Sequence, residues 1–247
     1  MTATLYSKTV GKGPTMVMLH GWGWNSQIWE PLLPELSQYF QLVLIDLPGF
    51  GQSPLNITNY TYELIAPLLL EIVPNPAIWL GWSLGGMLAW QMAIHYPDKV
   101  KKLITVASSP RFVAGKDWPG VSETTLAKFA ATLTTDYEKT LTGFLELQLR
   151  GNPSNQALLP DLEKQLLTDN QTPIAALKSS LKYLQATDFR SQVREVQCPE
   201  LHIFGSLDRL VPAKVASLIP GQSEIITHSG HMPFLSQQES FIRLIKP

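Results

Sequence analysis

The sequence has a single cysteine, Cys198, among 247 residues. One cysteine cannot build an intrachain disulfide framework or a multi-cysteine metal site. Charged residues are also scarce, at 16%, and the 19 Lys and Arg nearly balance the 20 Asp and Glu. Because clustered positive charge supplies most of the energy of nucleic-acid binding, this balance argues against a nucleic-acid partner.

Long apolar runs are missing as well, since no stretch approaches the roughly 18 apolar residues of a membrane-spanning helix. Residues 1–10 lack the basic region and apolar core of a secretory signal. We therefore expect a cytoplasmic protein with no membrane partner, acting as a monomer. No carboxylate pairs at metal-ligand spacing and no Lys-bearing phosphate loop lie near the loops discussed below, so we expect no metal or cofactor.

Short apolar runs bounded by Gly or Pro recur along the chain. This pattern is typical of strands buried on both faces of a sheet. The runs occupy residues 15–19, 42–45, 77–80, 103–107, 201–204 and 224–227. A helical pattern covers residues 85–96 and stops at Pro97, because proline disrupts the interior of a helix. Strands that alternate with helices predict an α/β fold with a mainly parallel central sheet and helices on both faces.

Residues 111–187 interrupt this alternation, because they contain helical patterns and no strand-like run. The helical stretches lie at 124–133, 137–149 and 173–184. We expect a core domain made of residues 1–110 and 188–247, with residues 111–187 inserted as a helical lid (cap). Open α/β sheets bind ligands at the carboxyl ends of their strands, so an insertion placed there would cover the site.

The strongest chemical motif is Gly81-Trp82-Ser83-Leu84-Gly85, which follows a predicted strand and opens a predicted helix. This is the setting of the Gly-x-Ser-x-Gly nucleophile elbow. The chain turns so sharply there that a side chain at either glycine would clash, and the turn exposes the serine hydroxyl above a helix N-terminus. Ser83 is therefore predicted to be a nucleophile.

A serine nucleophile needs a base, and we predict His231 for that role. It stands in Ser-Gly-His-Met-Pro-Phe, on a loop after the last predicted strand. Of the other histidines, His95 is expected at the surface, His202 in the core and His228 in solvent. His20 is expected to brace its own loop by hydrogen bonding.

The base needs an acid to hold its tautomer, and Asp208 follows the fifth predicted strand. Asp188 is the rival, although a helix cap or a solvated charge is the better interpretation of that residue. An ester oxyanion also needs backbone donors. We expect one from Leu84, directly after the nucleophile, and one from Trp22 in the loop that follows the first predicted strand. Trp22 and Trp82 are candidates to line an acyl pocket.

Taken together, these motifs resemble the α/β-hydrolase fold family from about residue 15 to the C-terminus. The chain order serine, acid, histidine also agrees with that family. Within the family, a set of motifs is similar to carboxylesterases of biotin synthesis that cleave a pimeloyl methyl ester carried on acyl carrier protein. These motifs are Leu19-His20-Gly21-Trp22-Gly23, Asp46-Leu47-Pro48-Gly49-Phe50-Gly51, Gly81-Trp82-Ser83-Leu84-Gly85-Gly86, Ala107-Ser108-Ser109-Pro110 and Phe144-Leu145-Glu146-Leu147-Gln148.

The resemblance implies that the ester is cleaved without a cofactor, and that the acyl carrier protein is the partner. It also implies substrate-binding roles for Trp22, Ser83, Leu84 and His231, and for the lid segment Phe144, Leu145, Glu146, Leu147 and Gln148. Lys139 and Arg150 flank that segment and are the candidates for carrier contact. The insertion nevertheless carries eight basic and eight acidic residues, so it has no net charge.

Two alternatives stay open at this point. The motifs define acyl transfer rather than the acyl group, so a general short-acyl carboxylesterase, lactonase or thioesterase of the same fold fits them too. A non-catalytic ligand receptor of this fold is the second alternative, although the intact set Ser83, Asp208 and His231 argues against it.

Overall fold

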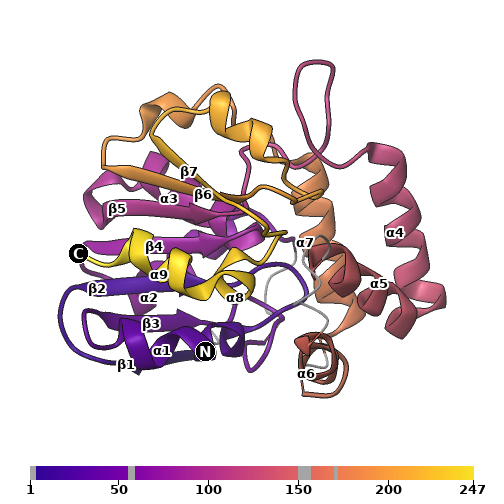
Figure 1. Cartoon of the computed structure of the whole chain (residues 1–247), viewed down its shortest axis with the longest axis horizontal. Helices are drawn as coiled ribbons and strands as arrows, with labels where there is room; N and C mark the ends of the chain where they lie inside the picture. Colours follow the sequence, from indigo (N-terminus) through magenta and orange to yellow (C-terminus); the bar gives the residue numbers. More distant parts are fainter. Residues whose placement is uncertain (1–3, 55–58, 150–156, 170–171) are drawn as a thin grey trace.

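A computed structural model describes residues 4–54, 59–149, 157–169 and 172–247. Its centre is a seven-stranded sheet in the order β1-β3-β2-β4-β5-β6-β7 (Figure 1). Only β1 runs antiparallel to its neighbour, and the other strands are parallel. The strands are β1 (Ser7–Val10), β2 (Thr15–Leu19), β3 (Gln41–Ile45), β4 (Ala77–Trp82), β5 (Val100–Val106), β6 (Glu200–Gly205) and β7 (Gln222–Ile226).

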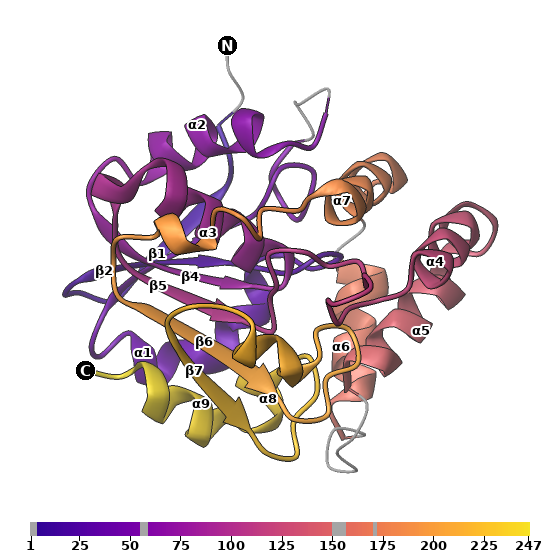
Figure 2. The same ribbon diagram turned by 90° about the horizontal axis from the view of Figure 1, so that it is seen from above.

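Helices cover both faces of the sheet, as Figure 2 shows: α2 and α3 lie on one face, and α1 and α9 on the other. The α-helices are α1 (Leu33–Leu36), α2 (Tyr62–Ile72), α3 (Leu84–His95), α4 (Glu123–Thr135), α5 (Tyr137–Leu149), α6 (Leu159–Lys164), α7 (Ile174–Ala186), α8 (Pro233–Ser236) and α9 (Gln238–Ile245). Shorter 3-10 turns are η1 (Ser26–Leu32), η2 (Pro97–Lys99), η5 (Val193–Glu195) and η6 (Ala213–Ser217), and η4 (Gln165–Asp169) is a π-helical turn.

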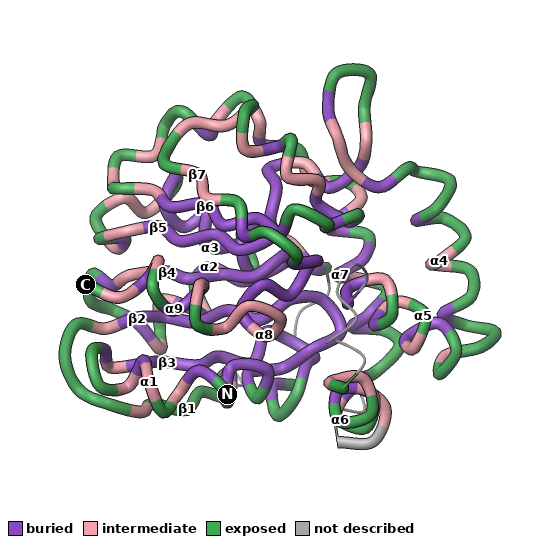
Figure 3. Tube along the Cα trace, viewed as in Figure 1, coloured by how far each residue is buried: buried purple, intermediate pink, exposed green. Residues whose placement is uncertain are grey.

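The six apolar runs all form strands, which confirms the predicted α/β architecture. Five of these strands are largely buried, as the purple tube through the sheet shows (Figure 3). The expectation of burial on both faces is wrong for β7, where Ile225 is 48% exposed. The reason is position, because β7 is an edge strand and pairs only with β6. Strand β1 was not predicted, since its exposed residues Ser7, Lys8 and Thr9 form no apolar run at the opposite edge.

The four α-helices α4 to α7 lie between β5 and β6 in the chain, within the segment that we call the helical insertion (residues 111–187). They stand beyond the ends of the strands to which the arrows of β4 and β5 point (Figure 1). Helices α4, α5 and α7 agree with the predicted helical stretches, whereas the short α6 was not predicted. Single β-bridges join Arg111 to Asp188 and Val113 to Val121 near the start of the insertion. The division into two domains at its ends stays a prediction.

Among the helices of the described residues, none combines the length and apolar character that crossing a bilayer requires. Within those same ranges, no group of three or more His, Cys, Asp or Glu side chains is arranged to hold a metal ion.

Candidate active site

Ser83 occupies the turn between β4 and α3, with a φ of 54° that non-glycine residues rarely adopt. The flanking glycines allow this turn. A Cβ at Gly81 would lie 2.2 Å from the Gly85 carbonyl oxygen, and one at Gly85 would lie 2.4 Å from the Leu19 carbonyl oxygen. The Ser83 amide donates to the Val106 carbonyl at 2.9 Å, which ties the turn to β5. The strained backbone is therefore fixed by its neighbours on both sides.

The structure brings Ser83, His231 and Asp208 into one hydrogen-bonded chain. The distance from His231 Nε2 to Ser83 Oγ is 3.0 Å, and that from His231 Nδ1 to Asp208 Oδ2 is 2.7 Å. All three residues are buried. Since the carboxylate can only accept, the ring carries its proton on Nδ1, and the bare Nε2 faces the serine hydroxyl.

The second oxygen of the Asp208 carboxylate is also occupied. Oδ1 accepts from the amides of Leu210 at 2.8 Å and Val211 at 3.0 Å. These bonds orient the carboxylate so that Oδ2 points at the imidazole.

The rival acid, Asp188, has a different environment, because Arg111 and Arg190 bond its carboxylate at 2.9 Å and 2.8 Å. The hydrogen bonds from Arg190 lower the pKa of Asp188 to about 2.

The remaining histidines lie where the sequence predicts them. His20 Nε2 accepts from the Leu47 amide at 2.9 Å, so Nδ1 carries the proton and donates to the Gly21 carbonyl at 2.8 Å. Burial lowers the pKa of His20 and keeps the ring neutral. His202 is fully buried in β6, whereas His95 and His228 are exposed.

The two predicted oxyanion donors, Trp22 and Leu84, come from different segments of the chain. Leu84 begins α3, where the first amides of a helix have no partner within the helix. Trp22 lies in the loop after β2, next to Gly23 with its φ of 83°. In the part of the chain that the structure describes, neither amide donates to a protein acceptor. The role of these two amides as an oxyanion hole stays a prediction.

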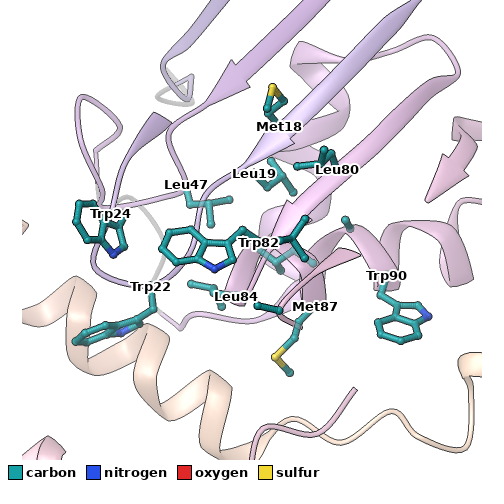
Figure 4. Packing of buried hydrophobic residues seen from close by; sticks show 14 of the residues in the cluster. Met18, Leu19, Trp22, Trp24, Leu47, Leu80, Trp82, Leu84, Met87 and Trp90 are labelled. Atoms are coloured by element: carbon teal, nitrogen blue, oxygen red, sulfur yellow. The ribbon is translucent and has the colours of Figure 1, made fainter. Parts of the chain in front are cut away.

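The tryptophans beside the serine have different environments. Figure 4 shows Trp22, Trp24 and Trp82 where the loops after β2 and β4 come together. The indole of Trp22 donates to the Leu177 carbonyl of α7 at 3.0 Å. Trp82 is not among the residues that line the pocket described next; its side chain is fully buried, and its indole donates to the His231 carbonyl at 2.8 Å. The prediction that Trp82 lines an acyl pocket is therefore wrong, and this residue instead bonds the loop that carries His231.

An apolar pocket opens on Ser83 beneath the helical insertion, and its enclosed space is about 40 Å³. Among the described residues that line it, only Ser83 and Thr125 are polar, and none is charged. The lining consists of Trp22, Ser83, Phe112, Val121, Thr125, Leu126, Phe129, Phe144, Leu147, Leu181, Leu184 and Leu210. A lining of this composition suits an aliphatic chain attached to a reacting carbonyl.

The predicted substrate-binding segment on α5 divides into different faces of the helix. Phe144 and Leu147 line the pocket, and the Phe144 ring lies 5.0 Å from that of Trp22. Leu145 and Gln148 are buried against other residues and Glu146 is exposed, so these three do not line the pocket. Phe144 and Leu147 are three residues apart and share a face, whereas Leu145 and Glu146 follow Phe144 directly and do not. Gln148 bonds the indole of Trp24 at 3.1 Å instead.

The structure describes one of the two candidates for carrier contact. Lys139 is exposed in the first turn of α5. Arg150 lies outside the described residues. Contact of either residue with a carrier protein stays a prediction.

Comparison with known proteins agrees with this geometry. The chain belongs to the α/β-hydrolase fold family, whose model matches residues 14–238. Curated relatives extend over nearly the whole chain. A pimeloyl-[acyl-carrier protein] methyl ester esterase of Vibrio vulnificus (strain CMCP6) is 39% identical over 98% of this chain and 96% of its own. The esterase of the same name from Edwardsiella ictaluri (strain 93-146) is 40% identical over 97% and 95%.

Solved structures show the same fold at lower identity. An esterase from Exiguobacterium antarcticum is 24% identical, with a TM-score of 0.84 over 98% of this chain and 93% of its own. The enol-lactonase from Burkholderia xenovorans LB400 is 19% identical, with a TM-score of 0.83 over 98% and 94%. At such identities the likeness concerns the fold alone.

Proposed function

We propose that the protein is a serine carboxylesterase that hydrolyses the methyl ester of a pimeloyl group carried on acyl carrier protein. The observation that carries the proposal is the buried chain from Asp208 Oδ2 through His231 to Ser83 Oγ, with bonds of 2.7 and 3.0 Å. It opens into an apolar pocket. Such a chain turns an otherwise weak hydroxyl into a nucleophile.

In the first half of the reaction, His231 Nε2 takes the Ser83 proton while Oγ attacks the ester carbonyl carbon. The resulting oxyanion accepts from the Trp22 and Leu84 amides, and Asp208 stabilises the imidazolium. When the carbon–oxygen bond to the methoxy group breaks, His231 returns the proton to that oxygen. Methanol leaves, and the acyl group stays on Ser83 as an ester.

In the second half, a water molecule gives one proton to His231 and attacks the acyl-enzyme. The tetrahedral intermediate breaks its bond to Ser83 Oγ, which recovers the proton from His231. The product is the free carboxylic acid, which ionises on release, while the thioester at the far end of the chain is retained. Balanced in this way, the cycle consumes one water and needs no metal or cofactor.

The pocket and the relatives support the choice of acyl group. A lining of aliphatic and aromatic side chains from α4, α5 and α7 fits the methylenes of a pimeloyl chain, with Phe144 and Leu147 among the contacts. Among the described residues of the lining, only Thr125 is exposed, so the carrier end of the chain would leave past the first turn of α4. The two relatives described above that bear this esterase name are 39% and 40% identical to the chain.

The partner that follows from this proposal is the acyl carrier protein. We assign carrier contact to Lys139 and Arg150. The balance of charge across the insertion does not oppose docking, because steering depends on local patches rather than on net charge.

The test compares two substrates with the purified protein: pimeloyl methyl ester on acyl carrier protein, and p-nitrophenyl acetate. The proposal expects a higher kcat/KM for the carrier-bound ester, and Ser83→Ala should lose hydrolysis of both by several orders of magnitude. The wild-type gene, but not Ser83→Ala, should restore biotin-free growth to a strain that lacks the esterase. Equal or better turnover of the acetate would instead favour a general short-acyl esterase. Binding without turnover would favour a receptor.

A further inference from the structure

We propose that Gln148 is a positioning residue that fastens the helical insertion to both loops that build the active site. These are the Trp22 loop (residues 20–25) and the histidine loop (residues 229–233). The inference rests on the proposed serine chemistry but not on the identity of the acyl group. It replaces a substrate-binding role for Gln148, whose side chain is 1% exposed and does not line the pocket.

The first link is made by the main chain. The His231 amide donates to the Gln148 carbonyl at 3.0 Å. This carbonyl is available because α5 ends at Leu149, and the last carbonyls of a helix have no partner further along it. Trp82 bonds the His231 carbonyl from the other side at 2.8 Å. Both polar groups of the His231 backbone are therefore held, one by the insertion and one by the core.

The second link is made by the side chain. The indole Nε1 of Trp24 donates to Gln148 Oε1 at 3.1 Å, and Trp24 is fully buried. Trp24 is two residues from Trp22, whose amide we assign to the oxyanion hole. The backbone amide of Trp24 donates to the Gly21 carbonyl at 3.3 Å and closes a turn in this loop. The conformation of the Trp22 loop therefore depends on the partner that α5 supplies.

The two links have one consequence for catalysis. Because both start from Gln148, the C-terminal turn of α5 sets the position of the base relative to the oxyanion donors. Misplacement of reacting groups by about 1 Å can cost roughly 100-fold in rate. Loss of the Gln148 acceptor should thus lower the rate of bond making without changing how an acyl chain binds.

The experiment uses Gln148→Met in the full-length protein, because methionine keeps the length of the side chain and removes the acceptor. Turnover is measured on p-nitrophenyl acetate and on a longer p-nitrophenyl ester of the same series. We expect kcat to fall by roughly 10- to 100-fold, by the same factor on both esters, with KM changed by less than about twofold. The exposed Glu138→Gln on the same helix is the matched control and should behave as wild type.

Hydrogen exchange gives a readout that does not depend on turnover. The peptide that contains the His231 amide should exchange faster in Gln148→Met than in wild type or Glu138→Gln. If Gln148→Met does not fold, Trp24→Phe removes the donor of the same bond. The same kinetic and exchange measurements then apply to that variant.

Two results would overturn the assignment. One is a kcat within about twofold of wild type on both esters, which would show that the bond does not position the site. The other is a rise in KM confined to the longer ester, which would return Gln148 to substrate binding. Failure of the pimeloyl proposal would appear separately, as poor turnover of the carrier-bound ester by the wild type.

Discussion

Replacing Asp208 with asparagine tests the direction of the hydrogen-bonded chain through His231. The two amides that bond Oδ1, at 2.8 and 3.0 Å, would keep the asparagine carbonyl oxygen where Oδ1 now lies. The reversed orientation would set an NH2 group against two N–H donors. At about 1.5 kcal/mol for each lost bond, it is disfavoured by about 3 kcal/mol and populated below about 1%. The NH2 group must then face His231 Nδ1.

An NH2 group can only donate, so the ring proton would move to Nε2, and Nε2 could no longer accept the proton of Ser83. We expect kcat for p-nitrophenyl acetate at neutral pH to fall by about 10⁴, the loss known for this change in another serine hydrolase triad. The melting temperature should stay close to that of wild type, because the residues have the same shape.

The matched control for this change is Asp188→Asn. It removes the charge of the rival acid, an exposed carboxylate that forms ion pairs with Arg111 and Arg190. It should keep kcat within about twofold of wild type, since surface ion pairs contribute little. An Asp208→Asn enzyme that retained more than a tenth of its kcat would refute the tautomer argument. So would a larger loss in Asp188→Asn than in Asp208→Asn.

Further predictions concern packing, the pocket and pH. In Gly205→Ala the new Cβ would lie 2.0 Å from the Gly230 carbonyl oxygen, so denaturant unfolding should show a loss of about 1–3 kcal/mol or more, and kcat should fall because the histidine loop moves. Leu147→Trp should fill the pocket and lower kcat/KM for long acyl esters more than for acetate; equal losses would contradict the assignment of this pocket to the acyl chain. Burial lowers the pKa of His20 below its ordinary 6.5, so below pH 6.5 the unfolded chain binds more protons than the folded one. The free energy of unfolding should therefore fall as the pH drops from 7.5 to 5.5, by at most about 1.4 kcal/mol per pH unit from this residue. In His20→Asn, the free energy of unfolding measured in urea should depend less steeply on pH than in wild type.

The sequence alone predicts the parts of this protein that local sterics and burial control. A turn that holds Ser83 at a φ of 54° needs glycine at 81 and 85, so the motif shows in the letters themselves. Buried parallel strands need continuous apolar residues, and five of the six runs are strands of that kind. Strand β1 was missed because an exposed edge strand needs no apolar pattern, and β7 was taken as buried because an apolar run does not reveal an edge.

Tertiary structure decided what depends on contacts between distant segments. Gln148 meets His231 and Trp24 across 83 and 124 positions of the chain, and no local pattern encodes a partner so far away. A helical pattern predicted α5, but its periodicity did not show which face would meet the pocket. Phe144 and Leu147 line it, whereas Gln148 turns toward the core. Local sequence determined the elements because backbone sterics and burial act residue by residue, and only packing decided which of their atoms meet.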